Sequence, residues 1–163
     1  PGFSAHQYCR RGKRRMSEQR HVTIVMIEDD EGHARLIEKN IRRAGISNEI
    51  RHFADGTSAL HYLENDTTGP ALNGPALVLL DLNLPDMSGT DILTRIKSDD
   101  RLKRTPVVVL TTTDDKVEIQ RCYDLGCNVY ITKPVNYESF ADAIKQLGLF
   151  LSVIQVPDAG AAG

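Results

Sequence analysis

Short apolar runs alternate with amphipathic segments along the chain from about residue 21 onward. Apolar, β-branched runs predict five strands, at residues 21–27, 49–53, 76–81, 106–111 and 128–132. Helical periodicity and helix-capping signals predict helices at residues 31–44, 55–64, 88–98 and 114–125, and a last helix from residue 136. Strands that alternate with helices form a parallel sheet covered on both faces. We therefore predict an α/β domain, a doubly wound five-stranded parallel sheet sandwiched by five helices.

Two of the predicted helices have a well-defined apolar face. The residues expected to point inward are Ala34, Ile37, Ile41 and Ala44 in the first helix, and Ile92, Leu93 and Ile96 in the third. Gly45 is expected to end the first helix, and Asp55 to cap the second. Two glycines and two prolines in residues 65–75 predict an exposed loop.

The first 20 residues are strongly basic, whereas the rest of the chain is acidic. They hold six Lys and Arg against one acidic residue, a charge of +5 that leaves −7 on the remainder. Residues 10–15, RRGKRR, are typical of a nucleic-acid-binding arm, of a disordered tail, or of translated sequence upstream of a start at Met16. Because the run lacks stacking aromatics and the body is acidic, we favour a disordered extension over 1–20 and no nucleic-acid partner.

Nothing in the sequence predicts a membrane or secreted protein. The chain has no run of about eighteen apolar residues, which a membrane span requires. No apolar signal segment follows the basic N-terminus. The three cysteines, Cys9, Cys122 and Cys127, lack metal-ligand spacing and are interpreted as reduced thiols. We therefore expect a cytoplasmic protein.

Polar residues follow four of the five predicted strands. They are Glu28, Asp29 and Asp30 after the first strand, Asp81 at the end of the third, Thr111 and Thr112 at the end of the fourth, and Lys133 with Pro134 after the fifth. The carboxyl ends of parallel strands share one edge of the sheet, where α/β proteins place their functional sites. Each feature alone has an ordinary structural explanation; an acidic triplet, for example, commonly caps a helix. Their joint occurrence favours one site.

These residue types suit phosphoryl chemistry. A buried carboxylate such as Asp81 is costly unless a metal, a lysine or a covalent modification compensates it. Clustered carboxylates are the ligands that Mg²⁺ prefers, and the cation also neutralises phosphate. Asp81 could then act as a nucleophile that forms an acyl phosphate. Lys133 and Thr111 would contact phosphate oxygens.

Four motifs in this order resemble the receiver domain of bacterial two-component response regulators, over about residues 21–150. They are IEDD at 27–30, LLDLNLPDMSG at 79–89, VVLTTT at 108–113 and VYITKP at 129–134. The resemblance implies a flavodoxin-like receiver domain at 21–156 with an extended C-terminal helix, and a flexible tail at 157–163.

The resemblance also implies a role for each matching residue. Asp81 would be the phosphoacceptor, Glu28, Asp29, Asp81 and the backbone carbonyl of Asn83 would hold Mg²⁺, and Thr111, Thr112, Lys133 and Tyr130 would bind phosphate or switch on phosphorylation. The protein would be a phosphoprotein of signal transduction, not an enzyme beyond its own phosphotransfer and autodephosphorylation. Its partners would be a cognate sensor histidine kinase and a downstream target or phosphorelay protein.

A narrower resemblance concerns the single-domain regulators that partner bacterial phytochromes. It is carried by the insertion at 65–75, the NLPDMSG turn and the tail QLGLFLSVIQVP at 146–157. The kinase would then be a bacteriophytochrome. A generic receiver with a variable loop is the alternative.

The last helix is apolar on more than one face, which predicts a contact surface. Phe140, Ile144, Leu147, Leu151 and Ile154 are expected to face the sheet, whereas Leu149, Phe150, Val153 and Val156 lie on other faces. We expect a symmetric homodimer through this helix. The alternative is a helix folded back on its own domain.

Two other functions are compatible with parts of the pattern. A Mg²⁺-dependent phosphatase of the haloacid-dehalogenase type would use an aspartyl nucleophile, but it requires a second Asp where this chain has Asn83. A receiver that serves as a phosphate-independent binding module is the other alternative.

Overall fold

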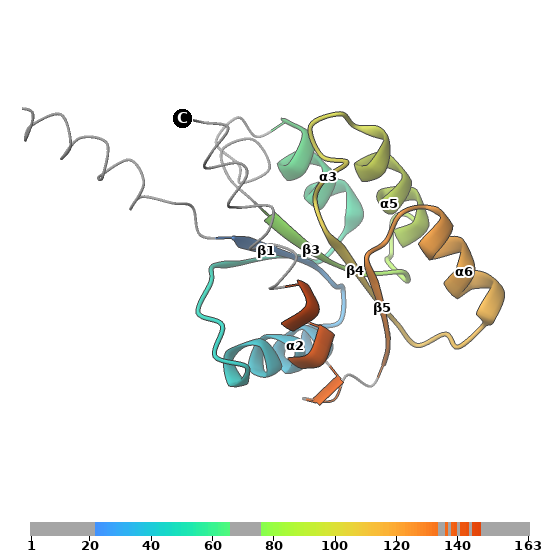
Figure 1. The fold of residues 1–163 in the computed structure, drawn as a ribbon. Helices are drawn as coiled ribbons and strands as arrows, with labels where there is room; N and C mark the ends of the chain where they lie inside the picture. Colours follow the sequence, from blue (N-terminus) through green and yellow to red (C-terminus); the bar gives the residue numbers. More distant parts are fainter. Residues whose placement is uncertain are drawn as a thin grey trace, which may run out of the picture.

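The computed structural model describes residues 22–65, 76–133, 136, 138–139, 141–143 and 145–147. Its strands are β1 (Thr23–Ile27), β2 (Ile50–Phe53), β3 (Ala76–Asp81), β4 (Val107–Thr111) and β5 (Val129–Thr132). Its helices are α2 (Glu31–Arg43), α3 (Gly56–Asn65), α5 (Gly89–Ser98) and α6 (Lys116–Asp124). Residues 138–139, 141–143 and 145–147 are helical as well. Strands and helices alternate in the predicted order (Figure 1).

The five strands form one parallel sheet in the order β2-β1-β3-β4-β5. The chain runs outward from β1 to β2 and then returns to place β3 on the other side of β1. The carboxyl ends of β1 and β3 therefore lie next to each other at a topological switch point, where open α/β sheets bind ligands. Ile27 and Leu80 are register partners, which brings Glu28 and Asp81 side by side.

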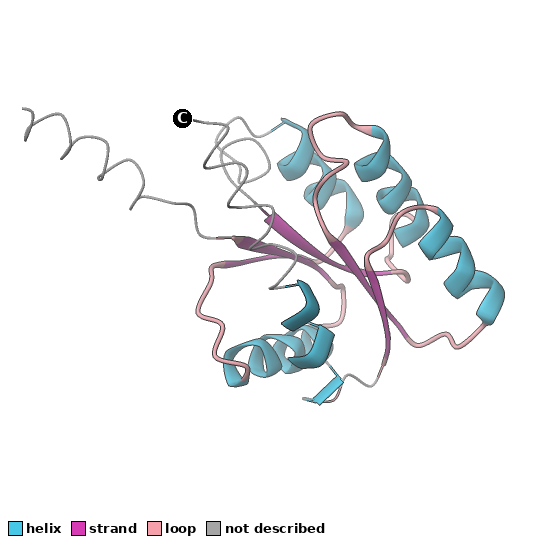
Figure 2. Ribbon diagram, in the orientation of Figure 1, coloured by secondary structure: helices cyan, strands magenta, loops and turns pink. Residues whose placement is uncertain are grey.

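Helices cover both faces of the sheet (Figure 2). The helical residues after 138 pack with α2 on one face, in a cluster that includes Ile37, Ile41 and Leu147. On the other face lie α3, α5 and α6, in a second cluster that includes Leu63 and Ile92. Consecutive residues of β1, β3 and β4 enter opposite clusters, so these central strands are buried on both faces. The predicted fold class is thus confirmed.

Most predicted boundaries are within two residues of the observed ones, and caps explain several of the differences. The helix predicted from residue 114 begins at Lys116, because Asp115 is its N-cap and accepts a hydrogen bond from the Val117 N–H. Ala44 is only partly buried, contrary to prediction, since it is the C-cap at which α2 ends. Asn40 is buried on that face instead.

Several predictions fall outside the described residues. They concern the extension at 1–20, the loop at 66–75, the tail at 157–163, and the contact residues Leu149, Phe150, Val153 and Val156. Of the cysteines, Cys122 and Cys127 are described, and both are buried and free. Over the part of the chain that is described, no helix has both the length and the apolar character that a membrane span needs.

Candidate functional site

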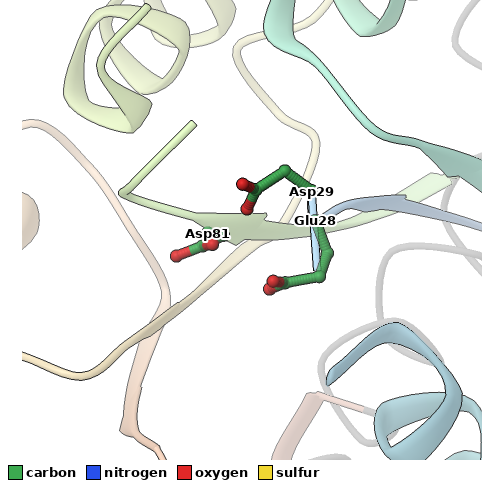
Figure 3. Close-up of side chains that lie close together, drawn as sticks. All are labelled: Glu28, Asp29 and Asp81. Carbon is green, nitrogen blue, oxygen red and sulfur yellow. The ribbon is translucent and has the colours of Figure 1, made fainter. Parts of the chain in front are cut away.

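Three carboxylates meet at the carboxyl ends of β1 and β3. Glu28 and Asp29 directly follow β1, and Asp81 is the last residue of β3. One oxygen from each carboxylate lies within 4.8 Å of the others (Figure 3). Glu28 and Asp81 are buried, with 1% and 4% of their surface exposed, whereas Asp29 is exposed. The cluster therefore has a buried floor and an open side.

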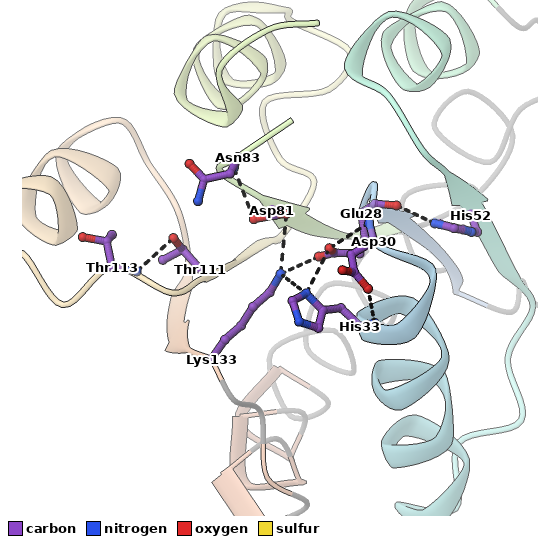
Figure 4. A network of polar contacts seen from close by, with 9 residues as sticks. All are labelled: Glu28, Asp30, His33, His52, Asp81, Asn83, Thr111, Thr113 and Lys133. Carbon is purple, nitrogen blue, oxygen red and sulfur yellow. Dashed lines mark hydrogen bonds and ion pairs between the residues drawn. The ribbon is translucent and has the colours of Figure 1, made fainter. Parts of the chain in front are cut away.

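Lys133 is the nearest cation to these carboxylates among the described residues. Its Nζ lies 2.7 Å from Oε2 of Glu28 and 3.5 Å from Oδ2 of Asp81, and its side chain is only 7% exposed (Figure 4). Lys133 directly follows β5, and its backbone N–H donates to the carbonyl of Thr111. This bond fixes the start of the lysine side chain at the end of β4. One ammonium thus partly offsets two buried carboxylates.

The electrostatic environment of Asp81 opposes its ionisation. Burial, together with the nearby negative charge of Glu28, raises the pKa of this carboxyl to about 6. The Asn83 N–H, which donates to Oδ1 of Asp81 at 3.2 Å, and the Lys133 ammonium act in the opposite direction. Repulsion between Glu28 and Asp81 is therefore not fully compensated by the protein. A hard cation among these oxygen ligands would relieve it, so the donor set fits Mg²⁺.

The hydroxyl groups predicted for the site lie at the end of β4. Thr111 is buried, and its Oγ1 accepts a hydrogen bond from the Thr113 N–H. Asp81 is paired with Leu110, so Thr111 is one residue beyond it on the neighbouring strand. Thr112 is the next residue and is exposed. This places one threonine in the interior and the other at the surface.

Tyr130 lies on β5 and contacts the same segment. Its hydroxyl donates to the carbonyl of Thr113 at 2.8 Å. Burial raises the pKa of this phenol to about 12, so the tyrosine stays protonated and remains a donor. The Thr113 N–H also donates to Thr111. A displacement of Thr111 would therefore move Thr113 and change the hydrogen bond between its carbonyl and the Tyr130 hydroxyl.

Asp30 has a different role from the two acidic residues before it. Its carboxylate accepts a hydrogen bond from the His33 N–H and caps α2, as is common for an acidic residue before a helix. The triplet therefore divides: Glu28 and Asp29 belong to the carboxylate cluster, and Asp30 belongs to the helix. The prediction of a carboxylate site thus applies to Glu28 and Asp29, and the alternative explanation as a helix cap applies to Asp30.

Sequence reasoning missed two histidines next to the cluster. Nδ1 of His33 lies 3.3 Å from Nζ of Lys133 and 3.5 Å from Oε1 of Glu28. His52, on β2, places Nε2 2.7 Å from the backbone carbonyl of Glu28. The spacing of His33 after Asp30 indicates only that it lies in the first turn of α2. The contact of His33 with Lys133 and that of His52 with Glu28 depend on strand order and could not be found from the sequence.

Comparison with known proteins shows the family. Residues 24–145 match the response regulator receiver domain. The chain therefore belongs to the family of response regulator receiver domains. Within this family the protein is a signalling regulator, whose chemistry does not extend beyond phosphotransfer. This assignment excludes the phosphatase alternative.

Similar proteins include phytochrome-associated regulators. Response regulator Rcp1 from Synechocystis sp. is 33% identical over 137 residues, which are 83% of this chain and 93% of Rcp1. The crystal structure of a receiver domain from Rhodospirillum rubrum is 70% identical, with a TM-score of 0.68 over 81% of this chain and 94% of that chain. The phosphorylated cyanobacterial phytochrome response regulator RcpA is 37% identical, with a TM-score of 0.67 over 80% and 94%. Rcp1 has also been solved in a Mn²⁺-bound form.

Proposed function

We propose that this protein is a phosphorylation-activated switch and that Asp81 accepts the phosphoryl group from a phosphohistidine of a sensor histidine kinase. The observation that carries the proposal is the position of Asp81. It ends a buried central strand, beside two further carboxylates and within 3.5 Å of the Lys133 ammonium. Such a carboxylate is held in one orientation, and an aspartate carboxylate is a side chain that can act as a nucleophile toward phosphorus.

Glu28, Asp29, Asp81 and the backbone carbonyl of Asn83 are the residues that would hold Mg²⁺. When bound, the ion would neutralise charge on the phosphoryl oxygens and so lower the barrier to in-line displacement. The protein supplies oxygen ligands only, which suits Mg²⁺ and also the Mn²⁺ bound by Rcp1. Asp29 is the exposed member of the set and borders the open side from which a phosphodonor would approach.

The transfer step itself requires few groups. A carboxylate oxygen of Asp81 forms a bond to phosphorus while the phosphorus–nitrogen bond of the phosphohistidine breaks, and the histidine leaves with the electron pair of that bond. Lys133 then exchanges part of its contact with Glu28 for a phosphoryl oxygen. The Thr111 hydroxyl donates to another phosphoryl oxygen, which requires it to move from its present position beside the Thr113 N–H.

Movement of Thr111 provides the output signal. Thr111, Thr113 and Tyr130 are linked by successive hydrogen bonds. Phosphorylation would thus shift the loop after β4 and the ring of Tyr130 between two arrangements, which changes the surface formed by α6 and β5. A partner that binds one arrangement better than the other would sense the phosphoryl group.

The experiment that tests this proposal is intact-mass measurement after incubation with Mg²⁺ and acetyl phosphate. We expect a gain of one labile phosphoryl group in the wild type and none in Asp81→Asn. An equal gain in both proteins would show that Asp81 is not the acceptor. No gain in the wild type, from acetyl phosphate and from a phosphorylated kinase alike, would favour a phosphate-independent binding module.

We further propose that the kinase is a bacteriophytochrome. Support comes from relatives named as phytochrome response regulators, among them RcpA. Phosphotransfer from a panel of purified kinases would test this. Transfer from a bacteriophytochrome should be faster than from unrelated kinases, and equal rates would contradict it.

The predicted homodimer remains a proposal, because Leu149, Phe150, Val153 and Val156 lie outside the described residues. It rests on the apolar composition of the tail. Light scattering of the wild type and of Phe150→Glu should distinguish the alternatives. A dimer that dissociates in the variant is expected, whereas a monomeric wild type at micromolar concentration would favour a helix folded back on its own domain.

A further inference from the structure

The loop between β3 and α5 is tied to the N-terminus of α3 by one carboxylate. Asp86 lies in the middle of this loop. Its Oδ1 accepts the Gly56 N–H at 2.9 Å, and its Oδ2 accepts the Thr57 N–H at 2.8 Å. The Thr57 hydroxyl donates to Oδ2 as well. Three donors from the first turn of α3 thus converge on a residue about 30 positions further along the chain.

An apolar contact lies beside these hydrogen bonds. A Cβ on Gly56 would lie 2.6 Å from Cγ of Met87, so the glycine allows the loop to rest directly on the helix start. Met87 also packs against the core cluster of α3 and α5. Asp86 and Met87 are adjacent, so polar and apolar contacts hold the same point of the loop.

The first half of this loop carries the backbone of Asn83. Asn83 forms an isolated antiparallel bridge with Ser88, and the Gly89 N–H donates to the carbonyl of Leu82. Gly89 is close-packed there, since a Cβ would lie 2.6 Å from the carbonyl oxygen of Asp81. The loop is therefore closed on itself at its base and attached to α3 at its tip.

We propose that Asp86 is a positioning residue for the metal site: by anchoring the tip of the loop to Gly56 and Thr57, it holds the Asn83 carbonyl where it can serve as a Mg²⁺ ligand. This inference rests on the function proposed above. Asp86 does not touch the metal site itself and acts through the loop. Groups that orient a ligand from behind commonly contribute substantially to metal affinity.

The coupling is reciprocal, because two linked equilibria affect each other equally. If the anchored loop binds Mg²⁺ more tightly, bound Mg²⁺ must strengthen the anchor. The amide protons of Gly56 and Thr57 report the anchor directly, since they are the donors to Asp86. Metal binding should therefore slow their exchange with solvent, although they belong to a different helix from the ligands.

The decisive measurement is the Mg²⁺ dissociation constant by titration calorimetry for wild type, Asp86→Ala, Asp86→Asn and Asp55→Ala. We expect about a tenfold weakening in Asp86→Ala, as for other residues that orient ligands. Asp86→Asn keeps one oxygen acceptor and should fall between wild type and the alanine variant. It also keeps the test decisive if the alanine variant does not fold.

Asp55→Ala is the matched control. Asp55 caps the same helix, accepting from the Ser58 N–H at 2.6 Å and from the Ser58 hydroxyl, but it is not bonded to the loop. Its loss weakens the start of α3 without releasing the anchor. Mg²⁺ affinity should therefore change less than twofold. An Asp55→Ala effect as large as that of Asp86→Ala would mean that helix stability, not the anchor, is responsible, and would overturn the proposal.

Amide exchange measured by NMR adds an independent result. Mg²⁺ should slow exchange at Gly56 and Thr57 in the wild type and not in Asp86→Ala. If the wild type binds Mg²⁺ and both Asp86 variants bind it with the same dissociation constant, this inference is overturned and the proposed function is unaffected. A wild type that binds no Mg²⁺ would overturn both.

Discussion

Asp81 and Asp86 are five residues apart in the same motif, yet their surroundings are opposite. Asp81 is buried beside Glu28, and its pKa is raised to about 6. Asp86 is exposed and accepts three hydrogen bonds from the start of α3, which lower its pKa to about 2. The surroundings of Asp81 therefore disfavour its negative charge, whereas those of Asp86 stabilise its negative charge through hydrogen bonds.

The difference suits the two carboxylates to different roles, Asp81 to binding and chemistry and Asp86 to holding the loop in place. The cluster around Asp81 keeps electrostatic repulsion that a cation can relieve, so binding of a cation there has a large effect. The loop around Asp86 has satisfied polar groups, so it can hold its shape while the charge next to it changes. The proposed phosphorylation site and the loop that supports it thus lie within a single turn.

The largest expected effect comes from removing the cation of the site. Lys133→Met removes the ammonium that lies 2.7 Å from Oε2 of Glu28 and leaves the Glu28 carboxylate buried without this ion pair. Breaking a buried ion pair in this way destabilises the folded protein by about 3 kcal/mol. The free energy of unfolding from urea titration should fall by this amount in EDTA. Saturating Mg²⁺ should restore part of the loss, since the metal ion then supplies positive charge in place of the missing ammonium. A loss unaffected by Mg²⁺ would place the ion elsewhere.

An intermediate effect of opposite sign is expected for Asp81→Asn. The raised pKa of Asp81 means that the folded protein binds this proton more tightly than the unfolded chain, so wild-type stability without metal falls as pH rises from about 4 to about 6. Asn removes that penalty and should stabilise the metal-free protein by about 1–2 kcal/mol at neutral pH. Urea titrations in EDTA at pH 4.5 and 7.5 would check this. The gain should be smaller at pH 4.5, and a gain independent of pH would contradict the explanation.

The smallest effect should come from Asp86, and it has the opposite pH dependence. Its lowered pKa stabilises the folded state above about pH 4, where an unfolded aspartate is ionised, and this contribution is lost as pH falls toward about 2. Asp86→Asn should therefore be less stable than wild type at pH 6, with a gap that closes in acid. Thermal unfolding across this range would measure it, with Asp55→Asn as a control at the same helix. A constant gap would show that the carboxylate charge does not contribute.

Local patterns determined much of this protein. Strand and helix types, their order and most of their ends could be predicted, because hydrophobic periodicity and caps act within a few residues. Asp115 shows the limit of that precision, since the helix after it begins two residues later than predicted. The sharing of one sheet edge by Asp81, Lys133 and Thr111 could also be predicted, since parallel strands end on the same side.

Tertiary structure decided which side chains meet and what charge they carry. The pKa of Asp81 depends on burial and on Glu28, some fifty residues earlier in the chain, which no local pattern contains. The anchoring of Asp86 to Gly56 and Thr57, and the contacts of His33 and His52, depend on how helices and strands are placed around the sheet. The sequence by itself therefore determined the fold class and the kinds of groups at the site. Long-range packing determined their distances and desolvation, because both depend on residues far apart in the chain.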